Sequence, residues 1–321
     1  MKNIITHTPT HRKSGGFKPT AFAMLLGKTK KIIYPSELFF FLYVSLNLPY
    51  VARLCMSNLA KHIKKITSSF VVDYFLPLLL FVLFFSCNNN NQKIVASNST
   101  PISHEIWDEL LQKHIVDGKV NYKEFAADKV RFDEYLNLLN THHPNDKNWS
   151  KDEQLACWIN AYNAYTVELI LKNYPVESIK DIKKGLPFFN SVWDIEFIEI
   201  EGNTYDLNHI EHEILRKDFD EPRIHFAIVC ASISCPNLWN KAFTADQIDA
   251  QLTTQARAFI NDKTKNNISP NDAQLSKIFS WFKSDFTKKT TLLDYLNQYS
   301  DTQISPDAKV SYLSYDWGLN E

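Results

Sequence analysis

Glycine is scarce in this chain, and its distribution limits the folds that the chain can adopt. Only 7 of the 321 residues are Gly, and the four that follow residue 100 stand far apart, at 118, 185, 202 and 318. Phosphate-binding loops and dinucleotide-binding turns need clustered glycines to bring backbone N–H groups against a phosphate. The sequence therefore excludes folds built on such loops, and its residues imply no cofactor.

Charge divides the chain into two unlike parts. Residues 1–87 hold 11 basic and 2 acidic residues, whereas the remaining 234 residues hold 24 basic and 34 acidic residues, a net charge of −10. An acidic domain repels the phosphate backbone of DNA and RNA. We therefore expect no nucleic-acid partner for the C-terminal part.

Residues 56–87 have the order of a bacterial secretory signal. A basic stretch is followed by an apolar run of 12 residues (74–85) and by Ser86-Cys87. The run is shorter than the roughly 20 residues that cross a bilayer, and a Cys after a small residue is typical of a lipoprotein cleavage site. We predict a signal peptide that ends at Cys87, lipidation of Cys87, and anchoring to a membrane of the bacterial cell envelope, facing the periplasm or the cell surface. The alternative is a short transmembrane anchor with a cytoplasmic N-terminus.

The segments around this signal have different characters. Residues 1–55 fit no export scheme, and we expect the true start of translation at Met56. Residues 88–103 are polar and lack hydrophobic periodicity, so we predict a flexible tether. Residues 104–321 then form one globular domain.

The pattern of this domain favours helices with a few strands. Apolar periodicity predicts helices over 104–116, 123–141, 150–173, 208–216, 244–262 and 275–298. Ser150 and Glu153 form a capping box at the start of the third helix. Alternation predicts a strand over 193–200 that returns through a hairpin, and the apolar run 225–230 is typical of a buried strand. The predicted fold is α+β, a single mainly helical domain with a small, mostly antiparallel sheet.

Nine short motifs of the domain resemble domain-of-unknown-function family 547. They follow one another from residue 118 to the C-terminus, and one of them is Cys-Ala-Ser-Ile-Ser-Cys-Pro at 230–236. The others lie at 120–122, 155–164, 174–176, 210–212, 215–216, 222–227, 275–279 and 315–317. The chain departs from the family at Cys157, where an aromatic residue is more frequent. The resemblance implies a domain of bacterial envelope proteins and plant proteins without a settled reaction.

The densest polar cluster, between residues 206 and 236, is consistent with nucleophilic catalysis. Cys235 follows an apolar run and precedes Pro236, so we expect it in a loop. A Cys nucleophile needs a base and a group that orients the base. His225 or His212 would be the base, and Glu211 or Asn160 would orient it. This hypothesis predicts a thiol-dependent hydrolase or acyl transferase that acts on an amide or ester of the envelope.

Two other interpretations of the cluster remain open. In an oxidising compartment Cys230 and Cys235 would form a disulfide, and the domain would be a non-enzymatic binding or structural module. Alternatively, His209 and His212 would bind a metal ion together with the two cysteines, although the Cys-x4-Cys spacing is wider than that of zinc knuckles.

Overall fold

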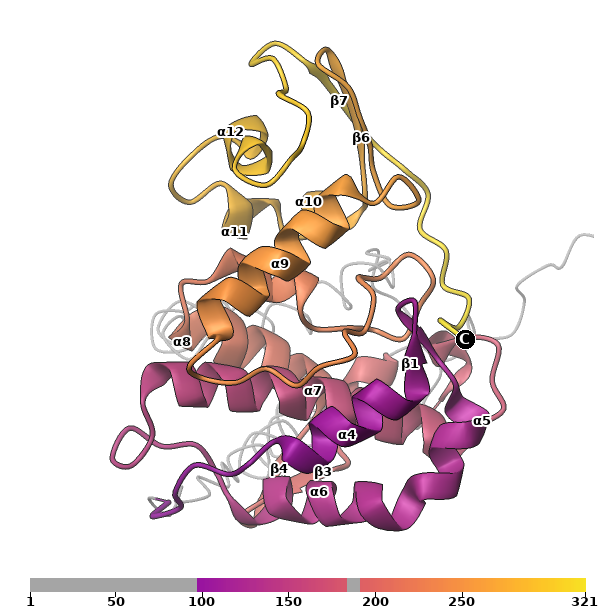
Figure 1. The fold of residues 1–321 in the computed structure, drawn as a ribbon, viewed down its shortest axis with the longest axis vertical. Helices are drawn as coiled ribbons and strands as arrows, with labels where there is room; N and C mark the ends of the chain where they lie inside the picture. The colour runs from indigo at the N-terminus through magenta and orange to yellow at the C-terminus, as the bar shows by residue number, and fades with distance from the viewer. Residues whose placement is uncertain (1–96, 184–190) are drawn as a thin grey trace, which may run out of the picture. The chain divides into compact units, whose positions relative to one another are not determined.

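The computed structural model describes residues 97–183 and 191–321, all of which belong to one compact unit (Figure 1). The signal peptide, Cys87 and residues 88–96 of the predicted tether lie outside the described residues. Among the described helices, none has the length and the apolar character needed to cross a membrane.

Helices dominate the unit, and the predicted α+β class is confirmed. The α-helices are α4 (Glu105–His114), α5 (Tyr122–Phe125), α6 (Lys129–Thr141), α7 (Lys151–Asn173), α8 (Arg216–Asp218), α9 (Ile248–Asn261), α10 (Ile278–Trp281), α11 (Lys283–Phe286) and α12 (Leu292–Asn297). The shorter helices are η1 (Ala126–Asp128), η2 (Ile179–Asp181), η3 (Val192–Asp194), the π-helix η4 (His209–Leu215) and η5 (Pro222–Phe226).

Three small sheets accompany these helices. Strands β1 (Ile115–Val116) and β2 (Lys119–Val120) form a hairpin, and its turn at Asp117 and Gly118 has positive φ angles of 51° and 78°. Strands β3 (Ile198–Ile200) and β4 (Asn203–Tyr205) form a second antiparallel hairpin. Strand β6 (Asp272–Leu275) pairs antiparallel with β5 (Asn267–Ile268) and parallel with β7 (Lys309–Tyr312). The sheets are small and mostly antiparallel, as predicted.

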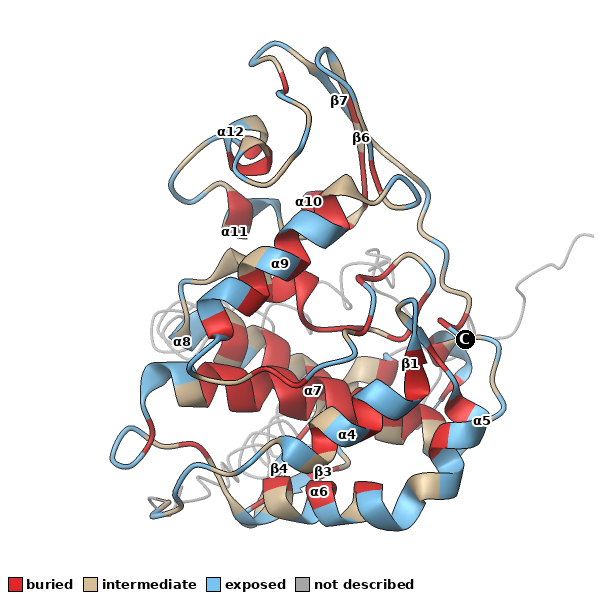
Figure 2. Ribbon diagram, in the orientation of Figure 1, coloured by how far each residue is buried: buried red, intermediate tan, exposed pale blue. Residues whose placement is uncertain are grey.

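Helix α7 is the centre of the larger hydrophobic core. It begins at the predicted capping box, in which Ser150 accepts from the N–H of Glu153 and the Glu153 carboxylate accepts from the N–H of Ser150. Figure 2 shows most of this helix as buried, whereas α4 and α6 bury one face each. A stack of Trp107 on Tyr135, with ring centroids 5.6 Å apart, joins α4 to α6. A second core cluster lies among α9 to α12 and β6.

Residues 225–229 are buried as predicted, but the segment 225–230 is not a strand, and Cys230 is partly exposed. Pro222 opens η5, because its fixed φ suits the first turn of a helix. The chain then runs along α7, where the Asn163 amide donates to the carbonyl of Ala227 and accepts from the N–H of Val229, both at 2.9 Å. One side chain therefore satisfies the backbone groups that a neighbouring strand would satisfy in a sheet.

Two further predictions about the elements were wrong. The strand predicted over 193–200 is confined to 198–200, because Ser191 and Asp194 form a capping box that starts η3 instead. The long helix predicted over 275–298 is divided into α10, α11 and α12, and residues before it contribute β5 and β6. Strand β6 pairs with β7, which lies more than 30 positions later.

Protonation of the half-buried His104 should make the fold sensitive to acid. Burial lowers the pKa of His104 to about 4, and its Nδ1 lies 2.8 Å from the Tyr135 hydroxyl. The unfolded chain binds this proton near pH 6.5, so the stabilisation is complete above that pH and is lost as the pH falls towards about 4. Urea denaturation at pH 7 and pH 4.5 should show a smaller loss in His104→Gln than in the parent. An equal loss in both would contradict the assignment.

Candidate active site

The loop that carries the two cysteines is held in place by the C-terminal segment of the chain. The N–H of Ile233 donates to the carbonyl of Gly318 at 2.7 Å, and the N–H of Ser234 donates to the carbonyl of Asp316 at 3.1 Å. At the start of the loop Ala231 has a positive φ of 54°, an uncommon conformation for a residue with a Cβ. This left-handed residue turns the chain sharply directly after Cys230.

The turn brings the two cysteines into contact. Their Sγ atoms are 2.9 Å apart, and the backbone N–H of Cys230 also donates to the Cys235 sulfur at 2.9 Å. Both are free thiols in this structure. Cys235 is buried, with 4% of its surface exposed, whereas Cys230 is partly exposed. We call this pair the dithiol.

The two thiols of the dithiol have opposite proton affinities. Burial favours the neutral form of Cys230, but hydrogen bonds from Cys235, Ser232 and Tyr315 to the sulfur outweigh burial and lower the pKa of Cys230 to about 7. The Ser232 and Tyr315 hydroxyl oxygens lie 3.1 and 3.2 Å from this sulfur. Burial and the adjacent Cys230 raise the pKa of Cys235 well above its usual value. Cys230 is therefore the thiol that ionises first, and its sulfur stays in hydrogen-bond contact with the sulfur of Cys235.

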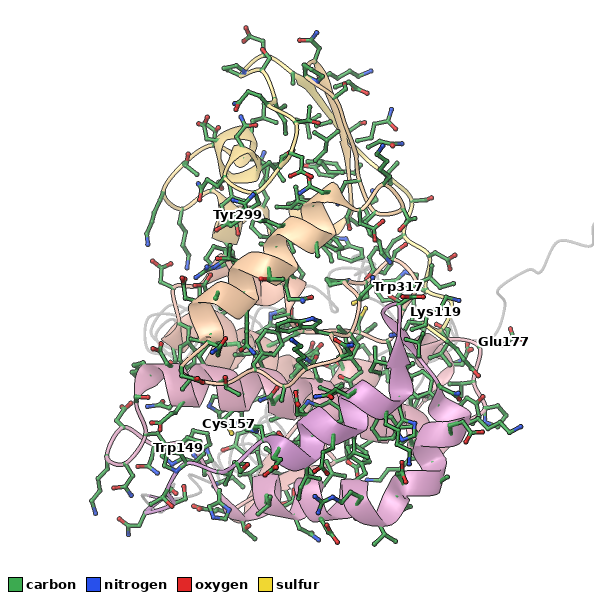
Figure 3. The ribbon with its side chains drawn as sticks, in the orientation of Figure 1. Lys119, Trp149, Cys157, Glu177, Tyr299 and Trp317 are labelled. Carbon is green, nitrogen blue, oxygen red and sulfur yellow. The ribbon has the colours of Figure 1, made fainter. Side chains whose placement is uncertain are left out.

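A cavity of about 190 Å³ opens onto the dithiol. Aromatic side chains form much of its wall, and we call them the aromatic rim: Trp193, Trp281, Phe282, Tyr315 and Trp317. The ring centroids of Tyr315 and Trp317 are 4.5 Å apart, and those of Tyr315 and Trp281 are 4.7 Å apart. Trp317, labelled in Figure 3, belongs to the same C-terminal segment that holds the loop. Trp281 is 48% exposed, so part of the rim faces solvent.

Glu211 lies in the wall of the same cavity, on the π-helix η4. It is 8% exposed, and its Oε2 accepts a hydrogen bond of 3.3 Å from the hydroxyl of Tyr162. Burial, and next the charge of Cys230, raise the pKa of Glu211 to about 7. No Lys, Arg or His among the described residues forms a salt bridge with it. A carboxyl of this kind exchanges a proton near neutral pH.

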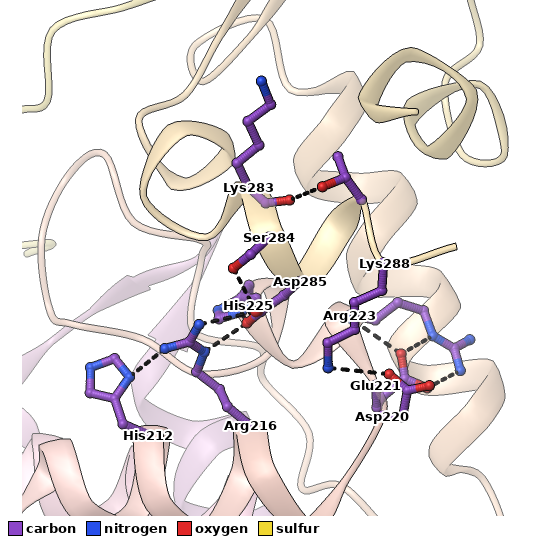
Figure 4. Close-up of polar contacts among 11 residues, drawn as sticks. His212, Arg216, Asp220, Glu221, Arg223, His225, Lys283, Ser284, Asp285 and Lys288 are labelled. Atoms are coloured by element: carbon purple, nitrogen blue, oxygen red, sulfur yellow. Dashed lines mark hydrogen bonds and ion pairs between the residues drawn. The ribbon is translucent and has the colours of Figure 1, made fainter. Parts of the chain in front are cut away.

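The two histidines of the cavity are occupied by another set of contacts (Figure 4). Arg216 binds the Asp285 carboxylate through two hydrogen bonds of 2.6 and 3.0 Å, and Nε2 of His225 lies 2.8 Å from the same carboxylate. Arg216 also donates to Nδ1 of His212 at 2.8 Å. Burial lowers the pKa of both histidines. We call these four residues the Asp285 network.

The structure thus brings four of the predicted site residues to one cavity but does not pair them as predicted. Cys235, His225, His212 and Glu211 all line it. Among the described residues, neither imidazole is hydrogen-bonded to either thiol, so the predicted base is not in contact with its nucleophile. Nδ1 of His212 accepts from Arg216, which leaves its ring proton on Nε2 in the neutral form.

Asn160 is placed elsewhere and has a structural role. Its amide donates to the carbonyl of Phe243 at 2.8 Å and accepts from the N–H of Phe243 at 3.0 Å. The side chain is fully buried, and both of its polar atoms are used. Asn160 therefore does not orient an imidazole at the cavity.

The remaining sequence interpretations concern metal binding and the third cysteine. Within residues 97–183 and 191–321, no group of three or more His, Cys, Asp or Glu side chains is arranged to hold a metal ion. His209 packs edge-on against Tyr205 instead. Cys157, labelled in Figure 3, is 1% exposed on α7, and burial raises its pKa to about 12. It is an inert core residue.

The sequence did not predict the roles of three polar groups that define the site. Asp285 organises both histidines, yet it stands on a short helix with no distinguishing pattern around it. Tyr315 and Ser232 stabilise the Cys230 thiolate. Both fall inside motifs noticed in the sequence, but only their spatial approach to Cys230 reveals what they do.

Residues 147–260 match the model of a protein family described as "Protein of unknown function, DUF547". The matched segment begins just before α7 and ends within α9, so it contains the dithiol, Glu211 and both histidines, but not Asp285 or Tyr315. No curated protein and no solved structure matches the chain.

Proposed function

We propose that this chain catalyses thiol–disulfide exchange, with Cys230 as the nucleophile and Cys235 as the resolving thiol. The observation that carries the proposal is the dithiol itself: two sulfur atoms 2.9 Å apart in a cavity, one a thiolate near neutral pH and the other a buried thiol. The thiolate is the attacking species in disulfide exchange, and the best attacking thiol has a pKa near the ambient pH. A second thiol within bonding reach completes the reaction.

The reaction proceeds in two balanced steps. The Cys230 thiolate attacks one sulfur of a substrate disulfide, so that a mixed disulfide forms and the other substrate sulfur leaves as a thiolate. Cys235 then loses its proton and attacks Cys230. A bond between Cys230 and Cys235 forms, and the second substrate sulfur leaves. The substrate gains the two electrons that the dithiol loses, and an external dithiol restores the reduced site by the reverse steps.

Acyl transfer is a second candidate, favoured by the position of Glu211. A thiol hydrolase needs an acid–base group near its nucleophile, and Glu211 is a buried carboxyl with a pKa of about 7 in the same cavity. Cys230 replaces Cys235 as the nucleophile in this version, because the pKa of Cys230 is the lowered one. A nearby thiol ready to form a disulfide favours exchange over acyl transfer.

We further propose that the domain works outside the cytoplasm, anchored to a membrane of the cell envelope through lipidated Cys87. The signal-like order of residues 56–87 supports export. Disulfides persist in oxidising compartments, so export supplies the conditions in which a dithiol exchanges. The partners are then the membrane, through the anchor, and a disulfide-bearing envelope protein or peptide.

A trapping experiment tests the exchange reaction. The reduced full chain is mixed with a peptide disulfide whose leaving thiol absorbs light. We expect the parent to release both thiols and to become lighter by two hydrogen atoms, as measured by mass spectrometry. Cys235→Ala should stop at the mixed disulfide, because the resolving thiol is missing.

Cys157→Ala is the matched control and should behave as the parent does, because Cys157 is buried in α7. A parent chain that forms no mixed disulfide but accumulates an acyl adduct with a thioester probe would select acyl transfer. A Cys230–Cys235 bond that persists in excess reductant would select the structural module.

A further inference from the structure

Among the cavity-lining side chains, Glu211 differs from the other acid–base groups in its contacts. His225 and His212 both belong to the Asp285 network, so one ring nitrogen of each histidine is already engaged in a hydrogen bond. Glu211 contacts only the Tyr162 hydroxyl in the hydrogen-bond pattern of the described residues. It lines the cavity together with both cysteines, and it is nearly buried.

The local structure explains why a carboxyl is held there without a cation. Residues 209–215 form a π-helix, a rare conformation that is frequent at functional sites. Glu211 lies on the buried side of this turn, whereas Glu213 is exposed and pairs with Lys217. Placing a buried carboxyl in an apolar cavity costs free energy unless the group is protonated. The arrangement therefore keeps one proton close to the dithiol.

We infer that Glu211 is the proton carrier of the dithiol, which it serves by giving a proton to each leaving substrate thiolate and by taking the proton of Cys235. This inference rests on the proposed exchange reaction. The titratable or charged groups that face Glu211 come from several elements. They are Tyr162 on α7, His212 on η4, Arg216 on α8, His225 on η5, Cys230 and Cys235 in the cysteine loop, Asp285 on α11 and Tyr315 in the C-terminal segment.

The protons and charges balance through the cycle. In the reduced site Cys230 is a thiolate and Glu211 is protonated. After the first attack Glu211 protonates the leaving thiolate and becomes a carboxylate. It then takes the proton of Cys235, whose thiolate attacks Cys230, and it passes this proton to the second leaving group. The oxidised site keeps the same net charge, carried by Glu211 instead of Cys230, and the cavity has room for water that relays the proton.

The charge of Cys230 sets the timing of these transfers. Burial is the main cause of the raised pKa of Glu211, and the Cys230 thiolate raises it further by repelling a carboxylate at this position. When Cys230 becomes part of a disulfide, the repulsion ends and Glu211 releases its proton more readily. The carboxyl is therefore an acid when a leaving thiolate appears and a base when Cys235 must react.

The test measures the second thiol release separately from the first. With the peptide disulfide probe at pH 7, we expect Glu211→Gln to slow the second release by about a hundredfold, the size of a typical general acid–base contribution. Glu211→Asp should recover part of the rate, because it keeps a carboxyl. Glu213→Gln, on the same helix but exposed, is the matched control and should keep the parent rate.

Infrared difference spectra of the full chain provide a signature that a structural role would not produce. The reduced-minus-oxidised spectrum near pH 6.5 should contain a carboxylic acid band that is absent in Glu211→Gln and present in Glu213→Gln. No such band in the parent, or a parent-like second release in a folded Glu211→Gln, would overturn the inference while leaving exchange intact. A parent that forms no disulfide would overturn the exchange reaction instead.

Discussion

Replacing Cys230 with Ala should slow the alkylation of the reduced full chain by iodoacetamide at pH 7 by about fiftyfold or more. At a pKa of about 7, half of the Cys230 side chains are thiolates at this pH. A thiol with a pKa of 9 or above is about 1% thiolate, and only the thiolate reacts. Among the described residues, Cys235 and Cys157, which are buried and have raised pKa values, would be the remaining targets, whereas Cys55 and Cys87 lie outside that part of the chain.

Two further variants test whether the lowered pKa of Cys230, and not only its exposure to solvent, determines the alkylation rate. Cys157→Ala should leave the rate unchanged. Cys235→Ala should also slow alkylation at pH 7, because Cys230 loses the hydrogen bond with Cys235 that lowers its pKa, and the rate should recover at higher pH. Parent-like alkylation in Cys230→Ala would show that another thiol is the nucleophile.

Removing the carboxylate of Asp285 should lower the free energy of unfolding by about 3 kcal/mol, the lower end of the range for breaking a buried ion pair. Hydrogen bonds from His225 and Arg216, against the opposing effect of burial, hold the pKa of Asp285 far below its usual value. In Asp285→Ala the Arg216 side chain, only 25% exposed, loses both of its bonds to the carboxylate. The side chain of His225 is 1% exposed and loses its partner as well.

Urea denaturation of the full chain at pH 7 measures this loss. Asp249→Ala is the matched control, because Asp249 also pairs with an arginine but is 85% exposed, and solvent screens such a pair. We expect a much smaller change there. Equal losses in the two variants would mean that the Asp285 network does not stabilise the domain.

Predictions from sequence succeeded where the signals are local. The helix at 151–173 combines a capping box with a long apolar pattern, and both operate within a few residues. The turn at Asp117 and Gly118 is likewise encoded in two adjacent residues. Residues 225–229 were correctly predicted to be buried, but a short apolar run does not distinguish a strand from other buried structure. The decisive partner, Asn163, lies more than 60 positions earlier.

The candidate site likewise combines features that local sequence predicts with contacts between residues far apart in the chain. Its region and most of its reactive residue types were apparent, because cysteines, histidines and Glu211 are concentrated in one stretch of sequence. Their roles depend on groups that arrive from distant parts of the chain. Tyr315 is one of the groups that lower the pKa of Cys230, and Asp285 is hydrogen-bonded to His225 and to the Arg216 that binds His212. Neither contact leaves a local pattern.

The hydrogen bonds between the C-terminal segment and the cysteine loop have a consequence for a polypeptide that is still being synthesised. Residues 316 and 318 fix the loop through their carbonyls, and Tyr315 supplies a hydrogen bond to Cys230, yet all three follow the loop by some 80 positions. A chain that has been synthesised or translocated only as far as α12 contains both cysteines but lacks the C-terminal residues that hold their loop. The Cys230 sulfur then lacks its hydrogen bond with Tyr315, so the reactive centre is completed only after the last residues of the domain have been delivered.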